Sequence, residues 1–251
     1  MSATTAVFKR ELKGYFGTPL AYVFLVVFLA AANFLAFRPI FTQGVGFFDG
    51  REASLRVFFA NLPLLFAFFA PAIAMRMWAE ERRTGTIELL LTLPVTVKQA
   101  VMGKFLAGWA FFGIALVLTM SMVLTVAYLG DPDPGPIAAG YLGAFLMAGA
   151  YLSIGAFFSS ITKNQVISFV LAAAVCGLLV YAGSPAVVDA VSGLWLIGTP
   201  LARFVESISF TTHYDVMQRG LIEFRDVFFM LCVTAGFLVA TVVMLDDKKA
   251  R

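Results

Sequence analysis

The chain has 251 residues, of which 61% are hydrophobic and only 13% are charged, and its mean hydropathy is +0.90. A balance this apolar excludes an ordinary water-soluble domain and indicates a membrane protein. We attribute the formal net charge of +3 to membrane topology and expect no nucleic-acid partner. The two cysteines, Cys176 and Cys232, lie in apolar runs, so we expect neither a disulfide framework nor a metal site.

The segment before the first long apolar run has the pattern of a short amphipathic helix. Its apolar residues recur at helical spacing on one side and its basic residues occupy the other: Val7, Phe8, Leu12, Tyr15 and Phe16 against Lys9, Arg10 and Lys13. This pattern is typical of a helix in the headgroup plane, so we expect an interfacial elbow helix. The charges alone would also fit a simple topology signal.

Six apolar runs follow, each long enough to cross a hydrocarbon core, which takes roughly 20 helical residues. They cover about residues 20–37, 57–75, 105–129, 137–158, 166–182 and 227–245. We therefore expect an all-α integral membrane protein with six transmembrane helices, a single domain over residues 1–251, and both termini on one side. Ala30–Ala32 resemble a signal-peptidase site, but the apolar run continues through Phe37, so we expect an uncleaved anchor.

The second and fourth runs carry residues that shape helix packing. Pro63 and Pro71 each remove a backbone donor from the second run, which bends a helix. Small residues three or four positions apart allow another helix, of this chain or of a second subunit, to approach the fourth run closely. These small residues are Gly140, Gly143, Ala144, Ala148, Gly149, Ser153 and Gly155.

Two segments are expected on the outer side of the membrane. Asp131–Pro136 contains too many prolines to continue a helix and predicts a turn. Residues 183–226 are too polar to span and too apolar for a free linker, so they predict two short amphipathic helices on the outer surface. Trp195 and Tyr214 suit the interfacial aromatic belt. His213, the only histidine, is expected at the surface or interface, with a vestibule or pH-sensing role as the alternative.

The distribution of basic residues predicts the orientation. If the N-terminus is cytoplasmic, the inner segments hold twice as many lysines and arginines as the outer ones, which is the positive-inside bias. The inner set is Lys9, Arg10, Lys13, Arg76, Arg82, Arg83, Lys98, Lys104, Lys163, Lys248, Lys249 and Arg251. Both termini and the loop between the second and third runs are therefore expected in the cytoplasm.

That loop contains an unusual leucine-rich helix. Apolar residues from Ile87 to Leu93 share one face, Pro94 ends the element, and Thr96–Gln99 form a capping box that starts the next helix. A short exposed helix with this much leucine favours a protein partner that covers it. The alternative is a helix that floats at the headgroup layer.

The residues of this loop also carry a family resemblance. Met75, Arg76, Ala79–Arg83, Gly85–Leu91, Pro94, Val95 and Gly103–Phe105 resemble the signature of ABC-2-type permeases, the membrane subunits of ATP-binding-cassette exporters. Within that class the chain most resembles the gliding-motility-associated GldF-like permeases of bacteria. The second half is similar too, in Ser209, Phe210, His213, Tyr214, and Arg219 through Asp226.

The resemblance implies a function and its partners. It implies an exporter permease in the bacterial inner membrane, paired with a second permease, identical or paralogous, and with cytoplasmic ATPase subunits. The chain has no phosphate loop, so ATP and Mg would be bound by the ATPase, and no cofactor is expected in this chain. The implied ATPase-docking residues are Glu80, Glu81, Arg82, Arg83, Gly85, Thr86, Glu88, Leu90, Leu91 and Pro94.

An intramembrane protease and a passive channel are the two alternative classes of protein. Glu80 and Glu81 superficially resemble the pair of an intramembrane glutamate protease, but no histidine is expected on their side of the membrane and no H-E-x-x-H is present. A passive channel would be expected to show charged rings or carbonyl-lined loops, and no charged residue lies in the middle of a predicted span. The sequence does not identify the substrate.

Overall fold

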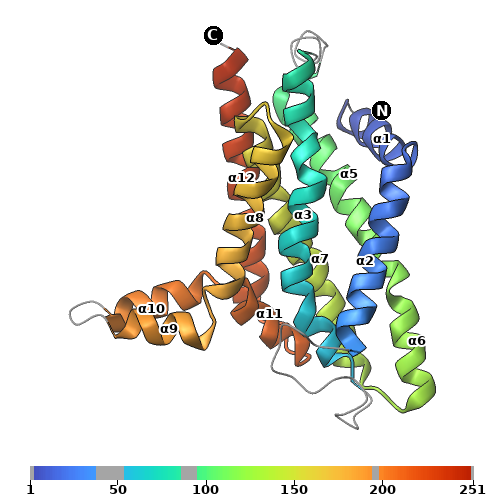
Figure 1. The fold of residues 1–251 in the computed structure, drawn as a ribbon, viewed down its shortest axis with the longest axis vertical. Coiled ribbons are helices and arrows are strands. Elements are labelled where there is room, and N and C mark those ends of the chain that lie inside the picture. Colours follow the sequence, from blue (N-terminus) through green and yellow to red (C-terminus); the bar gives the residue numbers. More distant parts are fainter. Residues whose placement is uncertain (1–2, 38–53, 86–94, 194–197, 250–251) are drawn as a thin grey trace.

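The structure, a computed structural model, describes residues 3–37, 54–85, 95–193 and 198–249, and all regular structure within these ranges is helical. The helices form an elongated bundle from which α9 and α10 project sideways at one end (Figure 1). Their bounds are α1 Ala3–Phe16, α2 Pro19–Phe37, α3 Arg56–Thr84, α5 Val97–Leu118, α6 Met120–Leu129, α7 Pro134–Ile161, α8 Gln165–Tyr181, α9 Pro185–Ser192, α10 Gly198–Ser207, α11 Phe210–Gln218 and α12 Phe224–Lys249.

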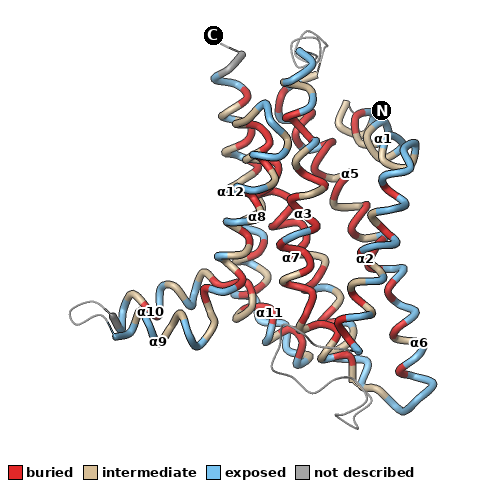
Figure 2. Tube along the Cα trace, viewed as in Figure 1, coloured by how far each residue is buried: buried red, intermediate tan, exposed pale blue. Residues whose placement is uncertain are grey.

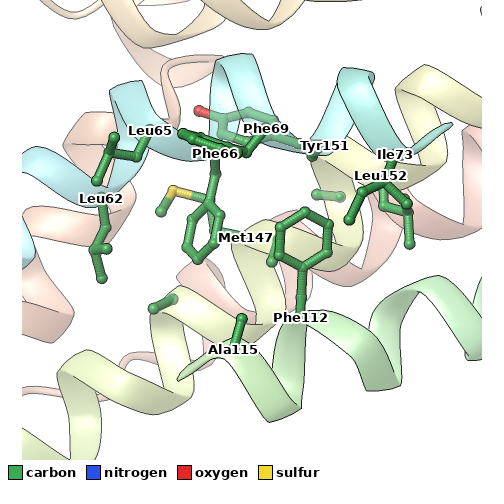
Figure 3. Close-up of a cluster of buried hydrophobic side chains, with 14 of the residues drawn as sticks. Leu62, Leu65, Phe66, Phe69, Ile73, Phe112, Ala115, Met147, Tyr151 and Leu152 are labelled. Carbon is green, nitrogen blue, oxygen red and sulfur yellow. The ribbon is translucent and has the colours of Figure 1, made fainter. Parts of the chain in front are cut away.

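The most deeply buried helices are α3 and α7, which lie side by side at the centre of the bundle (Figure 2). In the most apolar stretch of each, 72% of the residues are buried, against 17% in α12. Their contact is filled by large side chains such as Phe66, Met147 and Tyr151, with Phe112 of α5 closing one side (Figure 3). Because lipid is as apolar as these side chains, the close packing itself has to supply the stability of the contact.

The small residues of α7 allow these close contacts, and the neighbours belong to the same chain. A Cβ on Gly140 would meet the Phe59 ring of α3 at 2.7 Å, and one on Gly155 would lie 2.4 Å from the Ala74 Cβ. A Cβ on Gly149 would meet the Trp109 ring of α5 at 2.9 Å. The small-residue pattern therefore serves packing within the subunit.

The structure supports five or six membrane spans. Within the described residues, five helical segments are long and apolar enough to cross a membrane: α2, α3, α5 together with α6, α7 and α12. The sixth requires α8 and α9 to count as one span, although they are bent by 78° at residues 182–184. Pro63 and Pro71 both lie inside the continuous helix α3.

The α1 helix occupies the segment for which an interfacial elbow helix was predicted, and its apolar stripe is partly used inside the protein. Val7 is buried and lies against Gly103 of α5, where a Cβ would come within 2.7 Å of the valine side chain. Tyr15 and Phe16 contact the Phe111 ring, with ring centroids 5.5 and 5.7 Å apart. This face of α1 therefore attaches the helix to α5.

The two ends of the bundle are built differently (Figure 1). One end carries α1, the C-terminal end of α3 and the C-terminal end of α12, so both described termini lie together. The other end carries the α6–α7 turn and the short helices α9, α10 and α11. Two outer helices were predicted, whereas three short helices occupy the described part of that region, and Trp195 lies outside the described residues.

Candidate functional site

The candidate site lies at the end of the bundle where α3 ends and α5 begins. Gly85 caps α3 with φ of 73°, a left-handed conformation that glycine adopts without strain. The predicted capping box at the start of α5 is confirmed: the Gln99 N–H donates to Thr96 Oγ1 at 3.3 Å, and the Thr96 N–H donates to Gln99 Oε1 at 3.0 Å. Both ends of the linking segment are thus fixed by local chemistry.

A buried lysine ties three helices together beneath this loop. Lys104 of α5 is 4% exposed, and its Nζ lies 2.8 Å from Glu81 Oε1 of α3 and 3.5 Å from Glu11 Oε1 of α1. The same Nζ donates to the Met77 carbonyl at 3.0 Å and lies 5.1 Å from the centroid of the Trp78 ring. A buried ammonium needs such partners because desolvation of a charge costs several kcal/mol. We call Lys104, Glu81 and Glu11 the lysine network.

A serine from α7 fixes the same part of α3 from the opposite side. Ser159 Oγ accepts the N–H groups of Trp78 and Ala79, each at 3.0 Å, and donates to the Met75 carbonyl at 3.0 Å. One turn further, the Arg82 guanidinium donates to the Ser160 carbonyl. The last two turns of α3 are therefore held by both α5 and α7.

These contacts divide the predicted docking residues into groups. Glu81 and Arg82 bind α5 and α7, whereas Glu80, Arg83 and Gly85 are exposed. The remaining five predicted residues, Thr86, Glu88, Leu90, Leu91 and Pro94, lie outside the described residues.

Sequence reasoning missed the internal role of Lys104 and Ser159. Lys104 lies about two turns into α5, after the N-cap residue Thr96, so the capping box places it on the helix, but this position does not show that it is buried. The signal for Ser159 was the Ser159–Ser160 pair at the polar end of an apolar helix, because small hydroxyl side chains there can reach a neighbouring backbone.

A cavity of about 740 Å³ opens beside the lysine network, between α1, α2, α3 and α5. Its inner part is apolar, with Phe24, Ile73 and Phe111 among the lining residues, and its outer part includes Arg76 and Glu80 of α3. This volume falls within the range of small-molecule sites, roughly 300–1,000 Å³.

The histidine lies at the opposite end of the bundle, and the expectation that it is a surface residue is wrong. His213 is 5% exposed, and its Nδ1 lies 2.7 Å from Oδ1 of Asp226, which is fully buried. Nε2 donates to the Ser207 carbonyl at 2.9 Å, and the ring stacks on Phe229 with centroids 4.2 Å apart. His213 therefore joins α11 to α12 and to the end of α10.

Tyr214 is also more buried than expected for an aromatic belt residue. Its side chain is fully buried, and its hydroxyl donates to the Gly140 carbonyl of α7 at 3.1 Å. Tyr214 therefore does not face the lipid headgroups as a residue of the aromatic belt would, because α11 folds against α7 and encloses the ring.

Taken together, these features define a class: a polytopic helical membrane protein in which the end of α3 is held by buried polar contacts to α5 and α7, at the end of the bundle that carries both described termini. The family model for ABC-2 family transporter proteins matches residues 20–250. The chain therefore belongs to the ABC-2 transporter family, as a permease subunit. This assignment decides against the intramembrane enzyme, and Glu81 of the suspected carboxylate pair is bound to Lys104.

Two curated relatives match part of the chain. It is similar to the inner membrane transport permease YhhJ of Escherichia coli strain K12 and to the protein of the same name from Shigella flexneri. Each is 37% identical over 87 residues, which is 34% of this chain and 22% of the relative. The match thus spans about a fifth of the length of these relatives.

Proposed function

We propose that this permease subunit works in an exporter and couples ATP hydrolysis by a separate cytoplasmic ATPase to the movement of a substrate. The observation that carries the proposal is the anchoring of the last turns of α3 by Lys104 and Ser159. A partner that pushes on the exposed end of α3 would move α1, α5 and α7 with it, because these helices share the buried polar contacts. An isolated loop would absorb the same push.

The proposed docking surface consists of the exposed residues at the end of α3 and of the leucine-rich segment that follows. Glu80, Arg83 and Gly85 are accessible, and Thr86, Glu88, Leu90, Leu91 and Pro94 complete the predicted set. The leucines would fill a groove on the ATPase, and the charged residues would set the register, as is typical of interfaces with an apolar centre and a polar rim. ATP and Mg would be bound by that partner.

The experiment is co-purification from native membranes, in which any ATPase with a phosphate loop that is recovered with the permease is identified by mass spectrometry. Leu90→Asp combined with Glu88→Lys is expected to leave the permease inserted and to reduce the recovered ATPase at least tenfold. The matched control is Asp131→Lys, an exposed charge reversal at the other end of the bundle, which is expected to change nothing. Unchanged recovery with the double variant would contradict the docking surface.

We propose that the docking end lies in the cytoplasm of a bacterial cell, with the chain in the inner membrane. Support comes from the positive-inside bias, from the position of α1 and the end of α12 at the docking end (Figure 1), and from the inner-membrane relatives. An impermeant thiol reagent added to intact cells is expected to label a cysteine placed at Asp131 and to spare one placed at Arg83. The reverse pattern would invert the topology.

The closer resemblance to gliding-motility-associated permeases and the pairing with a second permease are further proposals. The first is supported by the residues quoted from Ser209 to Asp226, of which His213, Tyr214 and Asp226 make the buried contacts between α7, α11 and α12. The pairing with a second permease is supported by exposed apolar side chains on helices at the periphery of the bundle, such as Val26 on α2, which is 65% exposed. Cross-linking of two differently tagged copies separates an identical partner from a paralogous one.

A further inference from the structure

The cavity between α1, α2, α3 and α5 has an order of polarity that matches one class of ligand. Along α3 the lining changes from apolar at Ile73 to cationic at Arg76 and anionic at Glu80, which is closest to the helix end. The remaining charged groups of the lining are already engaged: Lys104 with Glu81 and Glu11, and Arg10 with Glu11 at 2.7 Å. Ligand recognition therefore depends on Arg76 and Glu80.

Arg76 and Glu80 are available for a ligand. Both are exposed, and within the part of the chain that the structure describes neither makes a side-chain ion pair. They lie four residues apart on one face of the helix, roughly 5–6 Å between their Cβ atoms. The order of cation before anion is the weaker arrangement for an intrahelical pair, since a glutamate stabilises best when it precedes the basic residue.

We propose that this cavity binds the headgroup and the first part of an acyl chain of one zwitterionic phospholipid, with a phosphate on Arg76 and an ammonium on Glu80. In such a lipid the phosphate is next to the glycerol and the ammonium is two carbon atoms further out. This sequence of apolar, negative and positive groups is complementary to the lining from Ile73 to Glu80. A primary ammonium can also donate hydrogen bonds to the carboxylate, which favours ethanolamine over choline.

The position of the cavity fits a lipid of the membrane in which the chain lies. Arg76 lies two turns before the end of α3 and directly follows the apolar run of residues 57–75, so Arg76 and Glu80 lie where headgroups are expected to begin. The proposal of a lipid site depends only on the membrane-spanning fold. The proposed cytoplasmic position of this end of the bundle adds that the lipid would come from the inner leaflet.

The structure offers a variant that fills the cavity without disturbing the packing. Gly14 lines the cavity, and no heavy atom lies within 4 Å of the position that a Cβ would occupy there. Gly14→Leu is therefore expected to fold and to occupy part of the volume. Arg76→Gln removes the phosphate partner, and Lys98→Gln is the matched control, since Lys98 is exposed near the same end and does not line the cavity.

The experiment is native mass spectrometry of the purified full chain released from nanodiscs that contain equal amounts of phosphatidylethanolamine, phosphatidylcholine and phosphatidylglycerol. The unaltered chain is expected to retain one phosphatidylethanolamine. Arg76→Gln is expected to lower that retention about tenfold, the effect of losing one hydrogen bond to a charged group. Gly14→Leu is expected to lower it because the new side chain occupies part of the volume that the lipid would fill. Lys98→Gln is expected to retain the lipid like the unaltered chain.

Three results would overturn the proposal. They are equal retention in all four proteins, which would mean lipid bound only around the outside; a preference for phosphatidylglycerol, which would contradict the charge order; and no retained lipid. A preference for phosphatidylcholine over phosphatidylethanolamine would support the zwitterionic site and refute the ammonium hydrogen bond. Glu80 also belongs to the proposed docking surface. Because the ATPase is absent from this experiment, the outcome is nevertheless independent of whether that surface binds a partner.

Discussion

Replacing Lys104 by methionine removes the cation of the lysine network while it keeps a flexible side chain of similar length. Glu81, with a side chain only 19% exposed, then loses its contact with Lys104, whereas Glu11, 24% exposed, keeps its contact with Arg10. Breaking a buried ion pair costs about 3–5 kcal/mol, and because both carboxylates keep some access to water we expect the lower end, ~3 kcal/mol. For a chain of this size, that corresponds to a melting temperature lower by roughly 6–12 °C.

The assay is thermal unfolding of the purified permease in detergent, compared with Lys98→Met on the same helix. Lys98 is exposed at the first turn of α5, and its substitution is expected to cost less than about 0.5 kcal/mol. In a double-mutant cycle with Glu81→Gln, the coupling to Lys104→Met is expected to exceed ~1 kcal/mol. If Lys104→Met unfolds at the same temperature as Lys98→Met, Lys104 does not hold α3 against α5. The proposal that a movement of α3 is transmitted to α5 through Lys104 would then be contradicted.

Two more substitutions test contacts elsewhere in the bundle, each measured by the same thermal unfolding. Asp226→Asn weakens the buried pair with His213 and is expected to lower stability by about 2–3 kcal/mol, whereas Asp189→Asn, the same change at an exposed position of α9, is expected to be nearly neutral; equal effects would show that the pair is not a structural contact. Gly155→Ala places a Cβ 2.4 Å from a Cβ of α3 and is expected to cost about 1–3 kcal/mol through overpacking. Gly177→Ala, with no atom within 4 Å of the new Cβ, is its control, and a tolerated Gly155→Ala would contradict the close contact of α3 and α7.

Most of the helices could be predicted from local properties of the sequence. Apolar run length locates α2, α3, α7 and α12, because each crosses the bundle by itself. The capping box could also be predicted, because its two residues, Thr96 and Gln99, lie within one turn of each other. The bend of 78° between α8 and α9 was not foreseen, because hydropathy reports length and not direction.

The burial of polar residues could not be predicted in the same way. His213 and Tyr214 are polar enough for a surface, and their burial results from contacts with residues 13 and 74 positions away. Lys104 contributed to the predicted topology as an ordinary inner-side charge, and only the approach of α1 and α3 shows that it is enclosed. Long-range contacts of this kind leave no local pattern.

The central claim is that the end of α3 binds an ATPase, and photo-cross-linking in intact cells tests it most directly. A photoreactive amino acid is placed at Arg83, at the exposed end of α3, and in a second protein at Asp131, at the opposite end. The account predicts that the probe at position 83 captures a protein with a nucleotide-binding phosphate loop and that the probe at position 131 does not. Capture of such a protein from neither position, or from both equally, would contradict it.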